Sequence, residues 1–262
     1  MDNELFYNIG WRNKITVCAY FTGKDYRHMV RPFVNSALAQ NYNVHIFTDV
    51  ELYGLPLNAT YHIFNPDHVE FFNKIADPSK EEQLSNKPAI WNYIRKVIGP
   101  CILMDIDTII LDDISDITRL ADIVFTLEER WSDQGMDYIN TGVMWAGSEK
   151  VMRDWAELTS KLTPKDIVAS RKQPYLAPDQ YAFHKLIDFK KDTVEYRYSD
   201  LNPMQILVDV LGVPCDVYNF NNPDKPIPPF CKVLHYKGSY CRTGGKQLPD
   251  DRKKIIEKYN NQ

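Results

Sequence analysis

The sequence predicts an α/β fold in which a mixed, mostly parallel twisted sheet is flanked by helices. Short apolar segments alternate along the chain with longer segments whose apolar residues recur at helical spacing. The 262 residues, 44% of them hydrophobic and 13% aromatic, suffice for a large core and disfavour disorder. Because no internal repeat or low-complexity linker divides the chain, we expect one domain over residues 1–262.

Each expected element follows from a local pattern. Short apolar runs that end in polar or turn residues predict strands over residues 14–20, 43–48, 101–104, 123–127, 138–145 and 232–236. Helical periodicity predicts helices over residues 26–40, 88–98, 115–120, 151–158 and 178–187. Pro88 and Pro178 each suit the first turn of a helix, and Gly99 ends the earlier one. Residues 219–229 hold four prolines and three asparagines and predict a surface loop near a site.

The composition argues against several classes of protein. A formal net charge of -4 without a basic stripe disfavours nucleic-acid binding, although a local basic pocket for phosphate remains compatible. No apolar stretch is long enough for a transmembrane helix, and residues 1–4 are acidic, unlike a signal peptide. We therefore expect a cytoplasmic protein. The cysteines are scattered and form no C-x-x-C pair, which disfavours zinc and disulfide frameworks: Cys18, Cys101, Cys215, Cys231 and Cys241.

Two carboxylates one residue apart, Asp105 and Asp107, lie inside an apolar run. Aspartate is depleted in strands and is seldom buried without a partner, so two of them at a strand end require a compensating charge. A divalent cation supplies that charge, and oxygen ligands at adjacent positions suit Mg²⁺ or Mn²⁺. The pair therefore predicts a metal site; the alternative is a turn in which both side chains face water.

The carboxyl ends of the first strands are expected to form a ligand site with this pair. In an open twisted α/β sheet, ligands bind where the carboxyl ends of the strands meet. Asp49 follows the second strand, and the first strand ends in Tyr20, Phe21, Thr22 and Gly23. A nucleotide is the natural ligand: Tyr20 or Phe21 would stack on the base, and backbone N–H groups near Thr22 would meet polar atoms. Ordinary strand-end packing is the alternative for both aromatic residues.

The order of several motifs resembles that of one enzyme family. The motifs are residues 26–38, Asp105-Ile106-Asp107, Asn140-Thr141-Gly142-Val143-Met144, Asp179-Gln180 and His235-Tyr236-Lys237-Gly238. Together they resemble glycosyltransferase family eight, the glycogenin and galactosyltransferase-like group of enzymes with a GT-A (Rossmann-like) fold. The resemblance implies a metal-dependent hexosyltransferase. Such an enzyme moves a hexose from a nucleotide-sugar, with a UDP-sugar favoured, to a carbohydrate or glycoconjugate acceptor.

The resemblance also implies a metal centre and a phosphate site. Asp107 and His235 would bind Mn²⁺ or Mg²⁺ directly, and Asp105 would be shared between the metal and the donor ribose. The metal would act as a Lewis acid on the donor pyrophosphate. Ile106 belongs to the same donor-binding motif. For His235 the alternative is a core histidine that binds nothing.

A second group of residues is implied in holding the donor sugar. Asp179 would accept hydrogen bonds from sugar hydroxyls, Gln180 would lie opposite the leaving group, and Asn140 would contact the sugar. Gly142 would let the sugar approach the backbone closely. For Asp179 the alternative is an acid favoured by the helix dipole at a helix start.

The basic residues of the site are less well determined. Lys87 is a candidate for donor contact, with a surface lysine at the start of a helix as the other interpretation. Lys237, next to Gly238, would place a positive charge against a phosphate oxygen. The family usually has its lysine a few residues after the glycine and before Pro-Trp, a dipeptide that this chain lacks, so Arg242 and Lys246 remain alternatives to Lys237.

The stereochemical outcome and two rival functions stay open. An amide such as Gln180 is a poor nucleophile and a poor base, which favours retention of configuration. Inversion would need a general base on the acceptor, with Glu128, Glu129 and Asp137 as candidates. One rival is a haloacid-dehalogenase-type phosphohydrolase, which also carries Asp-x-Asp after an apolar strand but near the chain start and followed by Gly-Thr. The other is a non-catalytic nucleotide-sugar-binding module.

Overall fold

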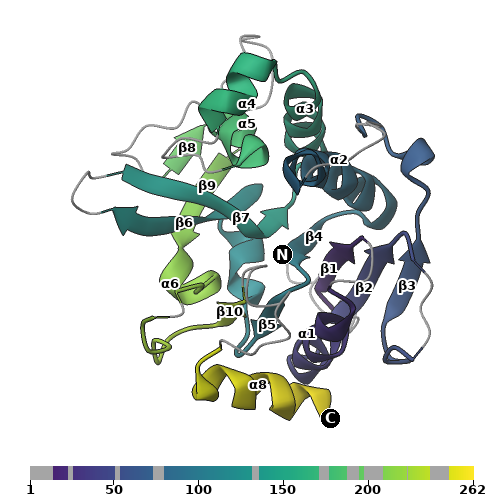
Figure 1. Cartoon of the computed structure of the whole chain (residues 1–262), viewed down its shortest axis with the longest axis vertical. Helices are drawn as coiled ribbons and strands as arrows, with labels where there is room; N and C mark the ends of the chain where they lie inside the picture. Colours follow the sequence, from purple (N-terminus) through teal and green to yellow (C-terminus); the bar gives the residue numbers. More distant parts are fainter. Residues whose placement is uncertain are drawn as a thin grey trace, which may run out of the picture.

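A mixed sheet of eight strands forms the centre of the molecule (Figure 1). The strands are β1 (Thr16–Phe21), β2 (Asn43–Thr48), β3 (Thr60–Ile63), β4 (Cys101–Asp105), β6 (Ile123–Trp131), β7 (Met136–Ala146), β8 (Glu195–Arg197) and β9 (Asp209–Pro214). Their order across the sheet is β3-β2-β1-β4-β7-β6-β9-β8. The structure is a computed structural model that describes residues 14–22, 26–50, 54–72, 80–131, 136–170, 177–187, 195–197, 209–222, 224–236 and 248–262.

The strand directions divide the sheet into two halves. In the first half, β1 pairs in parallel with β2 and β4, and β2 pairs in parallel with β3. In the second half, β7 runs antiparallel to both β4 and β6, whereas β9 is parallel to β6 and antiparallel to β8. All strands except β7 and β8 therefore run in one direction, and the predicted mixed, mostly parallel sheet is confirmed.

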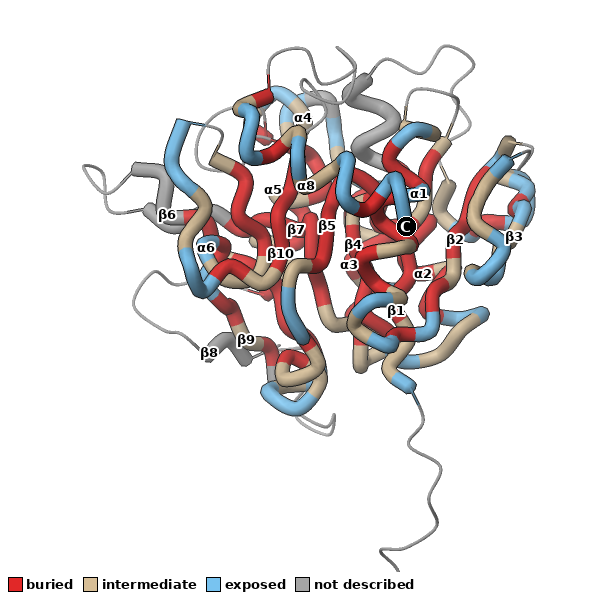
Figure 2. Tube along the Cα trace, turned by 90° about the horizontal axis from the view of Figure 1, so that it is seen from below, coloured by how far each residue is buried: buried red, intermediate tan, exposed pale blue. Residues whose placement is uncertain are grey.

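Helices cover both faces of this sheet. Within the described residues, the helices are α1 (Arg27–Ala39), α2 (Lys80–Ile98), α3 (Glu149–Ser160), α4 (Pro164–Ser170), α5 (Pro178–Leu186), α6 (Cys215–Tyr218) and α8 (Asp250–Asn260), with 3-10 helices η1 (Pro66–His68) and η2 (Ser115–Arg119). One core cluster contains Cys18 of β1 together with apolar residues of α2, α3 and α5; its counterpart contains Val17, Ala19 and the apolar face of α1. Successive residues of β1 therefore face opposite sides of the sheet, as the two-residue period of a strand requires. Figure 2 shows the buried residues running through the middle of the molecule.

A small second sheet completes the fold beside the main one. It consists of β5 (Thr108–Ile110) and β10 (Val233–His235), which pair antiparallel. A third apolar cluster joins this pair to α8 through Ile109, Leu234 and Tyr259. In Figure 1, α8 lies beneath the β5–β10 pair and beside α1. The carboxyl-terminal segment therefore braces the strand pair that follows the Asp-x-Asp motif.

Two helix predictions need correction or refinement. The helix expected to begin at Pro88 begins at Lys80, so Pro88 lies inside α2 and is buried. The polar sequence from Lys80 to Gln83 lacks apolar periodicity, so the pattern gave no sign of the first turns. The expected helix over residues 115–120 is the 3-10 helix η2.

Other elements went unpredicted, and the loop prediction holds in part. The short strands β3, β5, β8 and β9 and the helices α4, α6 and α8 were not predicted. The described residues of 219–229 form no helix or strand, apart from an isolated bridge between Phe220 and Leu234. However, Asn219 and Asn221 are buried, so the loop begins inside the protein.

The described cysteines are free and buried, as expected for core residues. None of the described helices is both long and apolar enough to span a bilayer.

Candidate active site

The two carboxylates lie at the carboxyl edge of the parallel half of the sheet. Asp105 is the last residue of β4 and pairs in register with Tyr20 of β1. Asp107 lies in the tight turn that separates β4 from β5, and Thr108 Oγ1 donates to Asp105 O at 2.7 Å to close this turn. The buried side chain of Ile106 anchors the turn in the core, so the chain turns with both carboxylates on the same side.

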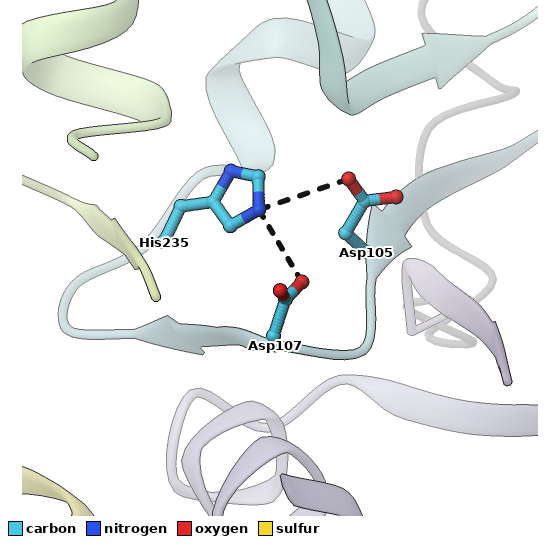
Figure 3. Close-up of side chains that lie close together, drawn as sticks. All are labelled: Asp105, Asp107 and His235. Atoms are coloured by element: carbon cyan, nitrogen blue, oxygen red, sulfur yellow. Dashed lines mark ion pairs between the residues drawn. The ribbon is translucent and has the colours of Figure 1, made fainter. Parts of the chain in front are cut away.

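His235 reaches the carboxylates because β10 pairs with β5. His235 is in register with Thr108, and the backbone N–H of Tyr236 donates to Asp107 O at 2.8 Å. Figure 3 shows one ring nitrogen of His235 facing both carboxylates. That atom, Nε2, lies 3.3 Å from Asp107 Oδ1 and 3.8 Å from Asp105 Oδ2. The predicted trio thus converges, with one ligand atom from each residue within 4.8 Å of the others.

Lys87 of α2 belongs to this cluster. Its Nζ lies 2.7 Å from Asp105 Oδ1 and 4.5 Å from the centre of the Trp91 ring. The side chain is buried, so the interpretation of Lys87 as a surface lysine is wrong. Lys87 occupies one oxygen of Asp105, and the other oxygen faces His235.

The electrostatic surroundings keep Asp107 ionised. Burial alone would raise the pKa of this carboxyl, which is only 5% exposed. The charge and hydrogen bond of His235, with a smaller effect from Lys87, outweigh the burial and lower the pKa of Asp107. Asp107 therefore provides a fixed negative charge in a site that excludes most water.

The donor set fits a hard divalent cation. Two carboxylate oxygens and one imidazole nitrogen converge from residues whose relative positions are fixed by backbone hydrogen bonds. Magnesium and manganese accept such ligands and usually retain positions for water or substrate phosphate. Asp105, Asp107 and His235 are therefore the residues that would hold the metal.

Asn140 and Gly142 lie on β7, immediately beside His235. The backbone N–H of Gly142 donates to Asn140 Oδ1 at 2.8 Å, and Asn140 Nδ2 donates to Glu128 Oε2 at 3.1 Å. Glu128 accepts a second amide hydrogen bond, from Asn221 Nδ2 at 3.0 Å. Glu128 is thus a buried acceptor in a polar network rather than a carboxylate facing solvent.

The structure gives Gly142 a role that the sequence did not suggest. A Cβ added at this position would lie 2.8 Å from His235 Cε1, 2.9 Å from His235 Nδ1 and 3.0 Å from Asn219 Nδ2. Contacts this short between a Cβ and a ring do not occur without displacement. Glycine is therefore needed here to make room for the imidazole, whether or not a sugar also approaches it.

Asp179 lies at the start of α5 on the other side of the site. Thr141 Oγ1 donates to its Oδ2 at 3.0 Å, whereas Oδ1 has no hydrogen-bond partner within the described part of the chain. Trp155 Nε1 donates to its backbone carbonyl at 2.8 Å. Burial is the main reason why the pKa of Asp179 is raised. The neighbouring Gln180 is half-buried in the same helical turn.

The remaining predicted residues differ in their access to this edge. Tyr20 is half-buried, and burial, followed by the charges of Asp105 and Asp179, raises the pKa of its hydroxyl well above the usual value. Phe21 is only 2% exposed and packs in the core, which leaves Tyr20 as the candidate for base stacking. Thr22 is half-buried and Asp49 is exposed at the end of β2. The predictions for Lys237 and Gly238 lie outside the described residues.

Sequence reasoning missed the asparagines that surround the site. Asn219 Nδ2 lies 2.9 Å from both Asn140 Oδ1 and Thr126 Oγ1, and its Oδ1 lies 2.9 Å from His235 Nδ1. The asparagine-rich start of the loop was noted as a composition, but its contacts join β6, β7 and β10. No local pattern could have identified them.

Comparison with known proteins establishes the fold. No family model and no curated sequence matches the chain. The apo form of glycosyltransferase GlyE from Streptococcus pneumoniae TIGR4 is 14% identical, with a TM-score of 0.56 over 95% of this chain and 60% of GlyE. Mouse xyloside xylosyltransferase 1 is 13% identical, with a TM-score of 0.50 over 86% of this chain and 98% of that protein. This is the GT-A fold. The chain spans 53% of another similar structure, the WbbM bifunctional glycosyltransferase, so it covers only part of that protein and of GlyE.

Proposed function

We propose that this chain is a metal-dependent glycosyltransferase. It moves a hexose from a nucleotide-sugar, with UDP-hexose as the favoured donor, to a carbohydrate or glycoconjugate acceptor. The observation that carries the proposal is the convergence of Asp105, Asp107 and His235 at the carboxyl edge of a sheet with the GT-A fold. Ligands bind at this edge in open α/β sheets.

The cluster suits the binding of a pyrophosphate. Asp107 and His235 would hold Mn²⁺ or Mg²⁺ directly, and Asp105 Oδ2 would complete the protein ligands. When bound, the cation supplies Lewis-acid stabilisation of the departing nucleoside diphosphate. Lys87 adds a fixed positive charge on the same side, close to Asp105. Because Lys87 is buried, water screens its charge poorly, so the charge acts strongly on a phosphate bound nearby.

The opposite side of the site suits a sugar. Asp179 Oδ1 is buried without a partner in the described part of the chain, so a ligand hydroxyl would relieve an unfavourable state. Asn140, on β7 beside His235, donates one amide hydrogen to Glu128; its second amide hydrogen has no acceptor among the described residues and would meet another sugar hydroxyl. Gln180, in the same turn as Asp179, would lie on the face opposite the leaving group.

The arrangement of carboxylates supports retention of configuration. An inverting enzyme requires a carboxylate with access to the acceptor hydroxyl. Glu128, one of three candidates, is buried and accepts hydrogen bonds from two asparagines. The side chains of Glu129 and Asp137 lie outside the described residues. In a retaining reaction the departing phosphate would help to remove the proton of the attacking hydroxyl on the same face.

The rival functions are supported less well. A haloacid-dehalogenase-type phosphohydrolase is disfavoured by the GT-A fold. A non-catalytic module would be expected to have lost part of the site, whereas Asp105, Asp107, Asp179 and His235 are all present at one edge.

Calorimetric titration tests the proposal. UDP, GDP, CDP and ADP are each titrated with Mn²⁺ and with EDTA into the wild-type protein, Asp107→Ala, and Asp112→Ala as a control at an exposed carboxylate beyond β5. We expect one nucleotide, UDP, to bind only with Mn²⁺, and to lose binding in Asp107→Ala but not in Asp112→Ala. Release of UDP from a UDP-hexose and the anomeric configuration of the product then test turnover and retention. If no nucleotide binds under any metal condition, the proposal is wrong.

A further inference from the structure

We propose that Asn219 is a positioning residue that fixes which nitrogen of His235 carries a proton and thereby directs the other nitrogen at the cation. The inference rests on the proposed metal site and concerns how the protein prepares it. A neutral imidazole has one N–H and one lone pair, and only the nitrogen with the lone pair binds a metal. The question is therefore what holds the proton on Nδ1.

The first link of the network is the side-chain amide of Asn140. The backbone N–H of Gly142 is always a donor, so the side-chain atom of Asn140 that lies 2.8 Å from it must be the amide oxygen. The nitrogen of the same amide then donates to Glu128 Oε2, at 3.1 Å. The orientation of Asn140 is thus set by the backbone and by a carboxylate.

The orientation of Asn219 follows from that of Asn140. The oxygen of Asn140 requires a donor from Asn219, at 2.9 Å. Thr126 leads to the same assignment, because its hydroxyl donates to Asn140 O at 2.7 Å and so its oxygen accepts from Asn219 at 2.9 Å. Two independent acceptors therefore face the amide nitrogen of Asn219, and its oxygen faces His235.

The proton of His235 is assigned by the last link. Asn219 Oδ1 lies 2.9 Å from His235 Nδ1, and an amide oxygen only accepts hydrogen bonds. Nδ1 must carry a proton in either charge state of the ring, so the neutral imidazole that binds a cation presents the lone pair of Nε2 to Asp105 and Asp107. A flipped Asn219 would set its oxygen against two acceptors and its N–H groups against the imidazole, so the network admits one arrangement.

The backbone holds the two residues of this last link in place. Phe220, next to Asn219, donates its N–H to Val233 O at 2.9 Å, and the N–H of His235 donates to Phe220 O at 2.9 Å. Asn219 is 0% exposed, so water does not compete for its amide. Gly142 contributes by leaving space for both side chains. Groups that hold a ligand histidine in this way typically contribute a factor of about 10 to 100 to metal affinity.

Binding of Mn²⁺ alone provides the test. The protein of 262 residues is titrated with Mn²⁺, without nucleotide, and free Mn²⁺ is measured by electron paramagnetic resonance. Asn219→Leu keeps the approximate volume and removes the amide. Asn221→Leu removes a buried amide from the same loop, but one that bonds Glu128 rather than His235. We expect Mn²⁺ affinity to fall about 10- to 100-fold in Asn219→Leu and less than about threefold in Asn221→Leu. Equal affinities of Asn219→Leu and the wild type would overturn the inference.

Two further measurements do not depend on Asn219→Leu folding well. Thr126→Val removes one of the two acceptors that orient Asn219, and we expect a smaller loss of Mn²⁺ affinity, about threefold. Long-range ¹H–¹⁵N spectra of the Mg²⁺-loaded wild-type protein report the tautomer of His235. The signals of His235 are identified because they are absent from the spectrum of His235→Gln. A proton on Nδ1 supports the inference, and a proton on Nε2 overturns it. If the wild-type protein binds no Mn²⁺ at all, the proposed function fails instead.

Discussion

Asp107 and Asp179 lie at the same edge of the sheet and are about equally buried, yet the pKa values of their carboxyl groups shift in opposite directions. The pKa of Asp179 is raised, and burial is the main cause. Burial also acts to raise the pKa of Asp107, but His235 and Lys87 outweigh it. Lys87 acts to lower the pKa of both carboxyl groups, so the difference lies in His235: its imidazole faces Asp107, whereas a threonine hydroxyl is the only side-chain donor that bonds Asp179 within the described residues.

This difference divides the site into two functional sides. On the side of Asp107 the pKa is lowered, which suits the cation and the phosphates of the proposed function. The side of Asp179 holds a carboxylate in an unfavourable state that a hydrogen-bond donor would improve. Strongly shifted groups of this kind cluster at functional sites. Each prediction below tests whether the two sides are as separate as the geometry indicates.

The largest expected effect separates nucleotide binding from sugar transfer. Asp107→Asn is expected to weaken Mn²⁺-dependent UDP binding at least about 100-fold, because it removes a charged ligand. Asp179→Asn is expected to change UDP affinity less than about threefold, because in the proposed function Asp179 contacts the sugar rather than the nucleotide, while hexose transfer is expected to fall steeply. Calorimetry with UDP and a transfer assay measure the two quantities. Equal losses of UDP affinity in both variants would show that the two sides are not separate.

An intermediate effect is expected at Gly142. In Gly142→Ala the new methyl group must displace the ring of His235, so the affinity for Mn²⁺ with UDP is expected to fall about tenfold. Gly212→Ala is the control, because its Cβ would meet Leu127 and Phe125 instead. If Gly142 serves mainly to admit the sugar, only binding of the UDP-sugar weakens and binding of UDP stays the same. Comparing the two ligands decides between these roles.

The smallest expected effect is on the free energy of unfolding. We expect the ionised carboxylate of Asp179 to lower it and that of Asp107 to raise it. The folded-state pKa of Asp179 is raised, so its ionised form lowers the free energy of unfolding at neutral pH, and this loss disappears as the pH falls through the raised pKa. Asp179→Asn should therefore raise the melting temperature near neutral pH. The pKa of Asp107 is lowered, so its contribution to the free energy of unfolding is present above the usual aspartate pKa of 3.8 and is lost as the pH falls through the lowered pKa.

Thermal unfolding in EDTA, from about pH 2 to about pH 8, covers the range in which both carboxylates change charge. Changes of about 1–3 kcal/mol are expected for buried polar groups, or a few degrees in melting temperature. Asp107→Asn should melt below the wild type at neutral pH and Asp179→Asn above it. If both variants melt above the wild type, or both below it, the contrast between the two carboxylates is wrong.

The sequence predicted well what depends on local patterns. Short apolar runs that end in polar or turn residues identified β1, β2 and β4, and parallel pairing brings Tyr20 and Asp105 into register. The Asp-x-Asp pair was recognised because two acids in an apolar run are unusual. His235 was predicted from motif order alone.

What the sequence did not predict depends on contacts between distant segments. Lys87 was placed at the start of a helix, where a surface lysine was one interpretation, yet α2 begins at Lys80 and carries Lys87 against Asp105. The network of Asn140, Asn219 and Thr126 joins three strands, and each residue alone resembles many others. The reason for a glycine at position 142 became visible only with the ring of His235 beside it.

The helix α8 has a consequence for how the protein is made. Arg252 Nη2 donates to the carbonyls of Asn222 and Lys225, at 2.6 and 3.0 Å, and Tyr236 donates its hydroxyl to Arg252 O at 3.1 Å. This helix thus ties down both the loop of Asn219 and the strand of His235. The carboxylates are synthesised long before the histidine and the helix that holds it. We therefore expect a nascent chain to bind a divalent cation at the proposed site only after α8 has left the ribosome.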